Sequence, residues 1–240
     1  MESFIVSLSA LAISIISLII SILQKTKETD RTIRKNLSDT LESVAKINIE
    51  VAKLKQDVLV FDSDDGIGLR RVYNSQRRIL IAHADFLVTK YYILATEIDC
   101  NLLAGAYQNI GDYEKAEIYW AKTIKKSKSN PIKLMNLRGY ARFLFFQGKF
   151  QLGRSKFDEA LKLDLPDTDV YRREISDTYF LWASVEKEFN NYSEVERLIS
   201  LGQTYCDRIG HLKMREEMKK RFEQFQSNIK SFVPPSDVVS

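Results

Sequence analysis

Apolar residues fill the chain from Phe4 to Leu23 without a charge, a proline or a glycine. About 20 such residues in a helix cross the ~30 Å hydrocarbon core of a bilayer. The run is longer than the apolar part of a signal peptide, and charged residues follow it instead of a cleavage site. We therefore predict a single transmembrane anchor in residues 1–23.

Basic residues after this run predict its orientation. Five lysines and arginines lie between Gln24 and Lys35, against two acidic residues. Basic residues that flank a membrane span stay in the cytoplasm. We expect the N-terminus outside and the remaining chain in the cytoplasm, as in a protein of a bacterial inner membrane.

Small residues recur along the predicted span in alternating steps of three and four, so they share one helix face. Small side chains let membrane helices approach closely, and hydroxyl groups can bond across the contact. The stripe favours association of membrane helices. Its alternatives are a water-lined pore in a larger ring, or serines that a membrane helix merely tolerates. The members of the stripe are Ser7, Ala10, Ser14, Ser17 and Ser21.

A second pattern occupies residues 24–61, where apolar positions alternate in steps of four and three. This heptad repeat is typical of a coiled coil, so we expect a stalk that joins two or three chains. The alternative is a long helix that folds back on the following domain. Thr40 is the one polar residue in the repeat. The predicted seam consists of Ile33, Leu37, Val44, Ile47, Val51, Leu54, Val58 and Phe61.

The remaining chain is predicted to be all-α. Residues 62–66 are acidic, end in a glycine and read as a linker. Helical periodicity then covers residues 67–232, and the whole chain has only nine glycines and four prolines. The amphipathic stretch from His211 to Phe232 is expected to cap the domain, and residues 233–240 to form a flexible tail.

Three segments of this domain share one internal spacing. Each predicts a helix with a small residue near its centre, a tight turn and a second helix. The small residue lets the two helices cross closely, and a large residue fills the groove between them. The matching positions are Leu103, Tyr107, Ala116 and Trp120 in the first segment, Tyr140, Leu144, Gly153 and Phe157 in the second, and Trp182, Glu186, Val195 and Ile199 in the third.

This arrangement resembles the tetratricopeptide repeat family, whose pattern is W-x2-L-G-x2-Y, then A-x3-F, then P. In the first copy, Ala104 stands in place of the glycine, and Pro131 follows late. The second copy also matches through Leu137, Ala141, Gly148, Ala160 and Pro166, whereas the third departs from the pattern. The resemblance implies an α-solenoid of three to four helical hairpins.

In this family, the first helix of each hairpin lines the ligand groove. Arg138 and Arg142 are four residues apart, so they share a helix face and could clamp a carboxylate or phosphate on an extended peptide. Alternatively, they are solvated or paired with nearby acidic residues. The resemblance places Asn101, Gly105, Gln108, Arg138, Arg142, Phe145, Phe180, Ser184 and Lys187 in the groove.

Motifs of catalysis are absent from the sequence, so we expect no enzyme, metal or cofactor. His83 and His211 are the only histidines, and no phosphate-binding loop, dinucleotide turn or nucleophile elbow occurs. Cys100 and Cys206 fall within helical patterns and are predicted to be buried free thiols in a reducing compartment.

The net charge of +4 is too small to predict a nucleic-acid partner. One helical stretch is locally basic, and its cations are expected to be solvated, with a phosphate-binding face as the alternative. These cations are Arg70, Arg71, Arg77 and Arg78.

These patterns favour a membrane-anchored, homo-oligomeric scaffold that recruits a protein or peptide partner at the cytoplasmic face. Joining several grooves would raise the effective concentration of a multivalent partner. One alternative is a sensor-effector whose serine-striped helices cluster and perturb the membrane. Another is a regulatory subunit of a separate enzyme.

Overall fold

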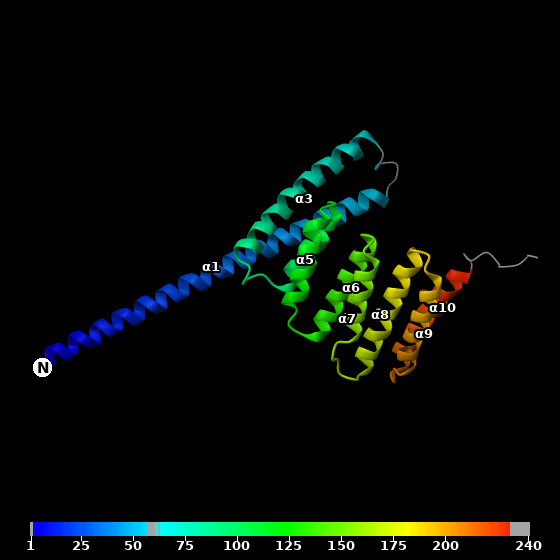
Figure 1. The fold of residues 1–240 in the computed structure, drawn as a ribbon. Helices are drawn as coiled ribbons and strands as arrows, with labels where there is room; N and C mark the ends of the chain where they lie inside the picture. The colour runs from blue at the N-terminus through cyan, green and yellow to red at the C-terminus, as the bar shows by residue number, and fades with distance from the viewer. Residues whose placement is uncertain (1, 57–60, 62, 231–240) are drawn as a thin grey trace, which may run out of the picture. The chain divides into compact units, whose positions relative to one another are not determined.

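The computed structural model describes the backbone of residues 2–56, 61 and 63–230, and the side chains of residues 16–56, 61 and 63–229. The regular structure of these residues is entirely helical, as predicted. The helices (Figure 1) are α1 (Glu2–Gln56), α3 (Asp64–Lys90), α4 (Glu97–Asn109), α5 (Tyr113–Lys126), α6 (Asn130–Phe146), α7 (Phe150–Leu161), α8 (Asp169–Glu188), α9 (Tyr192–Asp207) and α10 (Leu212–Lys230). Contacts divide the chain into two compact units, residues 1–126 and residues 127–240.

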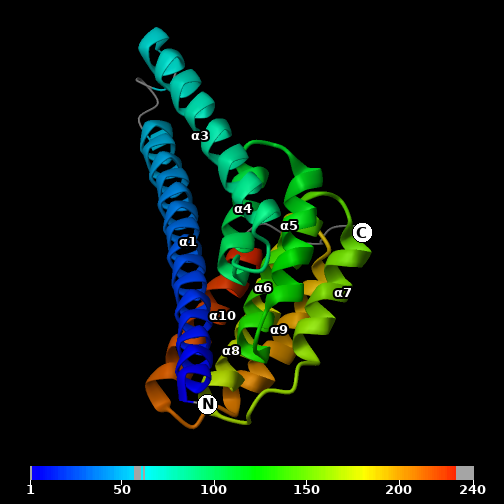
Figure 2. The same ribbon diagram turned by 90° about the vertical axis from the view of Figure 1, so that its left-hand side faces the viewer.

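In the first unit, α3 runs back along the second half of α1, and α4 packs against both helices (Figure 2). Leu37 and Val44 of the predicted seam are buried within this single chain, together with Leu41. Their burial agrees with the alternative of a helix that packs on the following domain. The pairing of stalks from two chains stays a prediction, and Val58 lies outside the described residues.

The predicted linker 62–66 largely forms the start of α3. Ser63 is the N-cap residue, and its Oγ accepts a hydrogen bond from the backbone N–H of Gly66 at 3.1 Å. Asp64 and Asp65 lie in the first turn, where negative charge is favourable near the positive end of the helix dipole. The acidic segment therefore begins the next helix.

The N-terminal part of α1 is exposed from residue 16 to residue 29. Among the described residues, no helix is long and apolar enough to cross a membrane, so the predicted anchor is not confirmed. Residues 4–15 of the predicted span, with Ser7, Ala10 and Ser14, lie outside the described side chains. Six large apolar side chains are exposed here, namely Ile16, Leu18, Ile19, Ile20, Ile22 and Leu23.

Three helical hairpins, α4–α5, α6–α7 and α8–α9, follow the repeated spacing. Ala104, Ala141 and Ala183 occupy the predicted small positions, and all three are completely buried. The turn residue has a positive φ in each hairpin, at the same place in the repeat. These turn residues are Gly111 (φ 79°), Gly148 (φ 70°) and Asn190 (φ 59°). The described residues thus show a helical-repeat-like fold.

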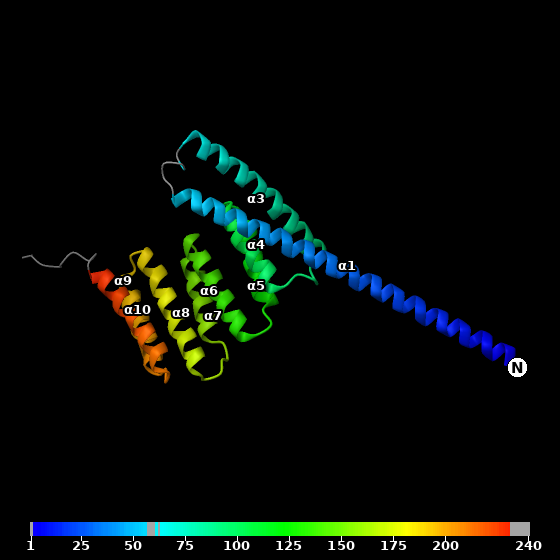
Figure 3. The same cartoon turned by 180° about the vertical axis from the view of Figure 1, so that it is seen from behind.

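The second unit stacks hairpin α8–α9 on hairpin α6–α7, and α10 packs against α8 and α9 (Figure 3). Phe157 stacks on Trp182 with ring centroids 5.3 Å apart, which joins the two hairpins. Phe222 of α10 is buried in the same hydrophobic core. The described part of the predicted cap therefore closes the end of this unit, whereas residues 233–240 lie outside the described residues.

Candidate functional site

One face of α6 carries an exposed apolar and cationic stripe. Met135, Arg142 and Phe146 are exposed, and Arg138 lies between the first two on the same stripe. Their spacing of three, four and four residues places them along one side of the helix. Arg138 and Arg142 were predicted to line the groove, whereas the exposure of Met135 and Phe146 was not read from the sequence.

Arg138 is held by two carboxylates of α8. Its guanidinium lies 3.0 Å from Glu174 and 3.2 Å from Asp177. Asp177 also accepts a hydrogen bond from Arg221 of α10 at 2.7 Å. Arg142 is different, because none of the ion pairs among the described residues involves it. Only Arg142 of the predicted clamp is therefore left to meet a ligand charge.

Two other predicted groove residues are covered by their own unit. Phe180 packs edge-on against Phe222, with ring centroids 5.5 Å apart, and tilted against Phe225. The ammonium group of Lys187 lies 5.1 Å from the centroid of the Phe225 ring. The α10 helix thus shields part of the α8 face. Ser184 donates to the carbonyl of Phe180 in its own helix.

Phe145 does not face a groove, contrary to the prediction. Its side chain is completely buried and belongs to the hydrophobic core of the second unit. Gly153 leaves the space for it, since a Cβ at this glycine would lie 2.5 Å from the Phe145 ring. Asn101, Gly105 and Gln108 are half-buried on α4, in the first unit.

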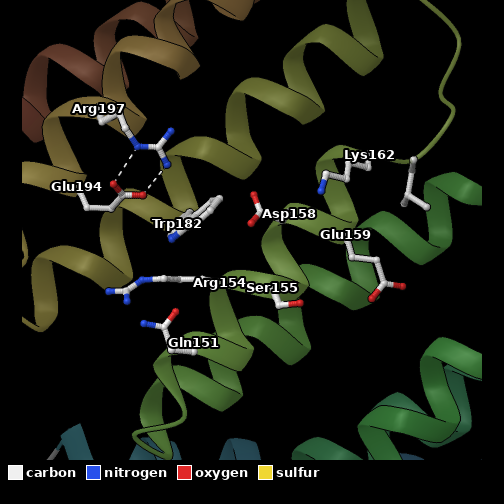
Figure 4. A pocket seen from close by; sticks show the side chains of 10 residues that line it. Gln151, Arg154, Ser155, Asp158, Glu159, Lys162, Trp182, Glu194 and Arg197 are labelled. Carbon is white, nitrogen blue, oxygen red and sulfur yellow. Dashed lines mark hydrogen bonds and ion pairs between the residues drawn. The ribbon is translucent and has the colours of Figure 1, made fainter.

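A hollow of about 790 Å³ lies on the surface made by α7, α8 and α9. Figure 4 shows charged side chains of both signs around it, with Trp182 between Glu194 and Asp158 in this view. The cations and carboxylates of the lining are equal in number. The lining residues are Gln151, Arg154, Ser155, Asp158, Glu159, Lys162, Leu163, Trp182, Glu194 and Arg197.

Arg154 of this hollow neutralises Glu186, which is completely buried. Arg154 Nε and Nη2 donate to the two carboxylate oxygens of Glu186, each at 2.7 Å. Trp182 Nε1 donates to Oε1 at 2.9 Å, and Asn191 Nδ2 donates to Oε2 at 2.8 Å. Burial acts to raise the pKa of Glu186, but these hydrogen bonds hold that pKa below its ordinary value. The arrangement stabilises the third repeat.

Other charges around the hollow are paired as well. Arg197 binds Glu194 in the same helix, with Nε 2.8 Å from a carboxylate oxygen. Glu159 accepts from Lys156 at 2.8 Å. Among the described residues, no cluster of histidines, cysteines and carboxylates could hold a metal ion.

In the first unit, Asp85 gathers three donors that sequence reasoning did not connect. It accepts from the Tyr107 hydroxyl at 2.5 Å, from the Tyr119 hydroxyl and from Lys115 Nζ at 2.8 Å. Burial opposes ionisation of Asp85, yet these hydrogen bonds lower its pKa to about 2. They join α3, α4 and α5, so we interpret the cluster as structural.

Both cysteines are buried free thiols, as predicted. Burial raises the pKa of Cys100 to about 11 and also raises the pKa of Cys206. The two thiols therefore stay protonated at neutral pH and lack the thiolate character of a reactive cysteine.

Comparison with protein-family models, curated proteins and solved structures finds no match to the chain.

Proposed function

We propose that the protein is a membrane-anchored helical-repeat adaptor that binds an extended segment of a partner protein. The observation that carries the proposal is the exposed stripe of Met135, Arg142 and Phe146 on α6. It lies on the helix face where the resemblance to tetratricopeptide repeats implies ligand binding. Apolar side chains that flank a cation are typical of a surface that binds another protein.

The stripe also indicates the chemistry of the partner segment. Met135 and Phe146 are about 16 Å apart along the helix axis, from the rise of 1.5 Å per residue. About five residues of an extended chain span that distance. Arg142 lies between the two ends and provides a positive charge. The segment that fits best has apolar residues at its ends and a carboxylate near its middle.

The exposed apolar surface of α1 supports the membrane anchor. The six large apolar side chains between Ile16 and Leu23 are each about half exposed, and they cover the helix surface outside the face of Ser17 and Ser21. So much apolar surface requires a partner or a lipid environment. The basic residues between Gln24 and Lys35 favour a cytoplasmic repeat domain, and association of the anchors would bring several stripes together.

Site-specific photocrosslinking tests this function on the full-length chain in its membrane. A photoreactive residue replaces Met135, and Arg142→Glu is introduced beside it. The matched control is Lys162→Glu, which reverses an exposed cation on the α7–α9 hollow. We expect one defined crosslinked partner that persists in the control and is lost with Arg142→Glu.

A crosslink that persists with Arg142→Glu and is lost with Lys162→Glu would contradict this proposal, because binding would then depend on the hollow instead of the stripe. If neither charge reversal changes the crosslink, the α6 stripe does not bind the partner. Purified partner fragments would then show by direct titration whether an acidic segment with apolar ends is the part bound.

A further inference from the structure

Arg77 of α3 is a buried cation that bonds to neutral groups. Its side chain is 9% exposed. Nη1 donates to Asn48 Oδ1 at 3.2 Å, and Nη2 donates to Asn74 Oδ1 at 2.8 Å. Nη2 also reaches the backbone carbonyl of Asn109 at 3.3 Å, while Nε has no hydrogen-bond partner. Within the part of the chain that the structure describes, no carboxylate pairs with this guanidinium.

This arrangement leaves the buried positive charge of Arg77 without a compensating anion among the described residues. Moving a cation out of water is costly unless an anion compensates its charge. Burial lowers the pKa of Arg77, and the neighbouring charge of Arg78 lowers it further. Sequence reasoning expected Arg77 on a solvated basic surface, but the structure buries it between α1, α3 and α4. A negative ligand would supply the missing charge.

A pocket of about 500 Å³ adjoins Arg77 and contains further donors. Lys55 and Arg70 line it, and none of the described residues of its lining is a carboxylate. Asn48 and Asn74 direct their carbonyl oxygens to Arg77, so their amide NH₂ groups remain as donors. Its volume falls in the range of pockets that hold small molecules, about 300–1,000 Å³.

We propose that this pocket binds a small phosphorylated molecule, with the phosphate held by Lys55, Arg70 and Arg77. A phosphate suits three cations better than a carboxylate does, because it carries up to two charges and offers three acceptor oxygens. The three cations belong to α1 and α3, so binding would stabilise the packing of these two helices in the first unit. This inference is independent of partner binding at α6.

The position of the pocket favours a soluble ligand over a lipid headgroup. Asn48 lies 25 residues after Leu23 on the continuous helix α1. At 1.5 Å per residue, that is about 38 Å from the end of the proposed membrane span. A phospholipid in the same membrane would not reach this depth of the cytoplasm.

Isothermal titration calorimetry on the full-length chain in detergent micelles tests the proposal. The probes are inorganic phosphate, pyrophosphate and adenosine monophosphate in a phosphate-free buffer. Lys55→Gln and Arg70→Gln should each weaken binding about tenfold, the loss expected for one hydrogen bond to a charged group. Arg77 is kept, because its replacement could disturb folding. The matched controls are Arg71→Gln and Arg78→Gln, which remove exposed cations of α3 outside the pocket and should change binding less than about twofold.

Four results would overturn the proposal. The first is no saturable binding of any probe, and the second is equal weakening by pocket and control variants, which would indicate general attraction to a basic helix. The third result concerns Asp57 and Asp62, two acidic residues that lie between Lys55 and Arg70 in the sequence. If phosphate binds only after Asp57→Asn and Asp62→Asn are combined, the chain supplies the anion itself. Binding to vesicles with phosphatidic acid, but to none of the soluble probes, would identify a lipid and also contradict the proposal.

Discussion

Replacing Arg154 with methionine should destabilise the second unit by leaving a buried carboxylate without its counter-ion. Glu186 is completely buried and receives two of its four hydrogen bonds from Arg154. Trp182 and Asn191 donate the other two, but neither carries a charge. In Arg154→Met, Glu186 must remain ionised without compensation or take up a proton.

The proton uptake sets the size of the effect. Holding a glutamate protonated at pH 7 costs about 1.4 kcal/mol for each pH unit above its ordinary pKa, which amounts to about 3 kcal/mol. Breaking a buried ion pair on one side costs about 3–5 kcal/mol. We therefore expect Arg154→Met to lower the unfolding free energy by about 3 kcal/mol at pH 7, with most of this loss gone near pH 4.5.

The sign of the pH dependence distinguishes the two proteins. In the native chain the folded pKa of Glu186 is lowered below its ordinary value of 4.5. Its stabilising contribution is therefore present above that value and is lost as the pH falls through the folded pKa. In Arg154→Met, burial without the counter-ion favours the protonated form, so stability should rise as the pH falls from 7 towards 4.5.

Urea unfolding followed by Trp182 fluorescence measures both effects. The chain has two tryptophans, so Trp120→Phe is used as the background to isolate the signal of the second unit. The matched control is Arg197→Met, because Arg197 binds a glutamate that is 23% exposed and should cost less than about 1 kcal/mol. Equal losses for Arg154→Met and Arg197→Met, or a loss that does not change with pH, would refute the reasoning.

Three further substitutions examine the turns, the Asp85 cluster and the packing of α1. Gly148 has a φ of 70°, so Gly148→Ala should cost about 1 kcal/mol. Gly105→Ala, with open space around the added carbon, should instead gain about 0.5–1 kcal/mol in urea unfolding followed by Trp120, the tryptophan of the first unit. Asp85→Asn should cost about 1–3 kcal/mol, and thermal scans of the native chain should show this contribution fading as the pH falls from 3.8 through about 2. Leu41→Ala should cost about 2–5 kcal/mol, with a Tm independent of protein concentration because Leu41 is buried within one chain; a Tm that falls on dilution would indicate burial between chains.

The hairpins could be predicted from the sequence because their signals are local. Ala141 lies within α6 and Gly148 lies in the turn that follows it. The small side chain of Ala141 indicates a close crossing of helices, and the glycine indicates a turn residue in the left-handed region. The sequence does not predict which side chains pair with one another across the fold. Glu186 departs from the family pattern, and only the fold shows that Arg154, 32 residues away, compensates it. Phe145 was placed in the groove because its helix position fits, but the missing side chain at Gly153 draws it into the core.

The α1 helix shows why a heptad pattern alone does not identify the partner helix. A spacing of 3.5 residues arises wherever two helices cross at a shallow angle, whether they belong to one chain or two. In this structure α3 and α4 bury the middle of α1, at Leu37 and Val44. The same continuous helix exposes its large apolar residues between Ile16 and Leu23. The two stretches of one helix therefore differ: the chain's own helices cover Leu37 and Val44, whereas the apolar side chains from Ile16 to Leu23 are exposed and would be covered only by the membrane anchoring or chain association that we propose.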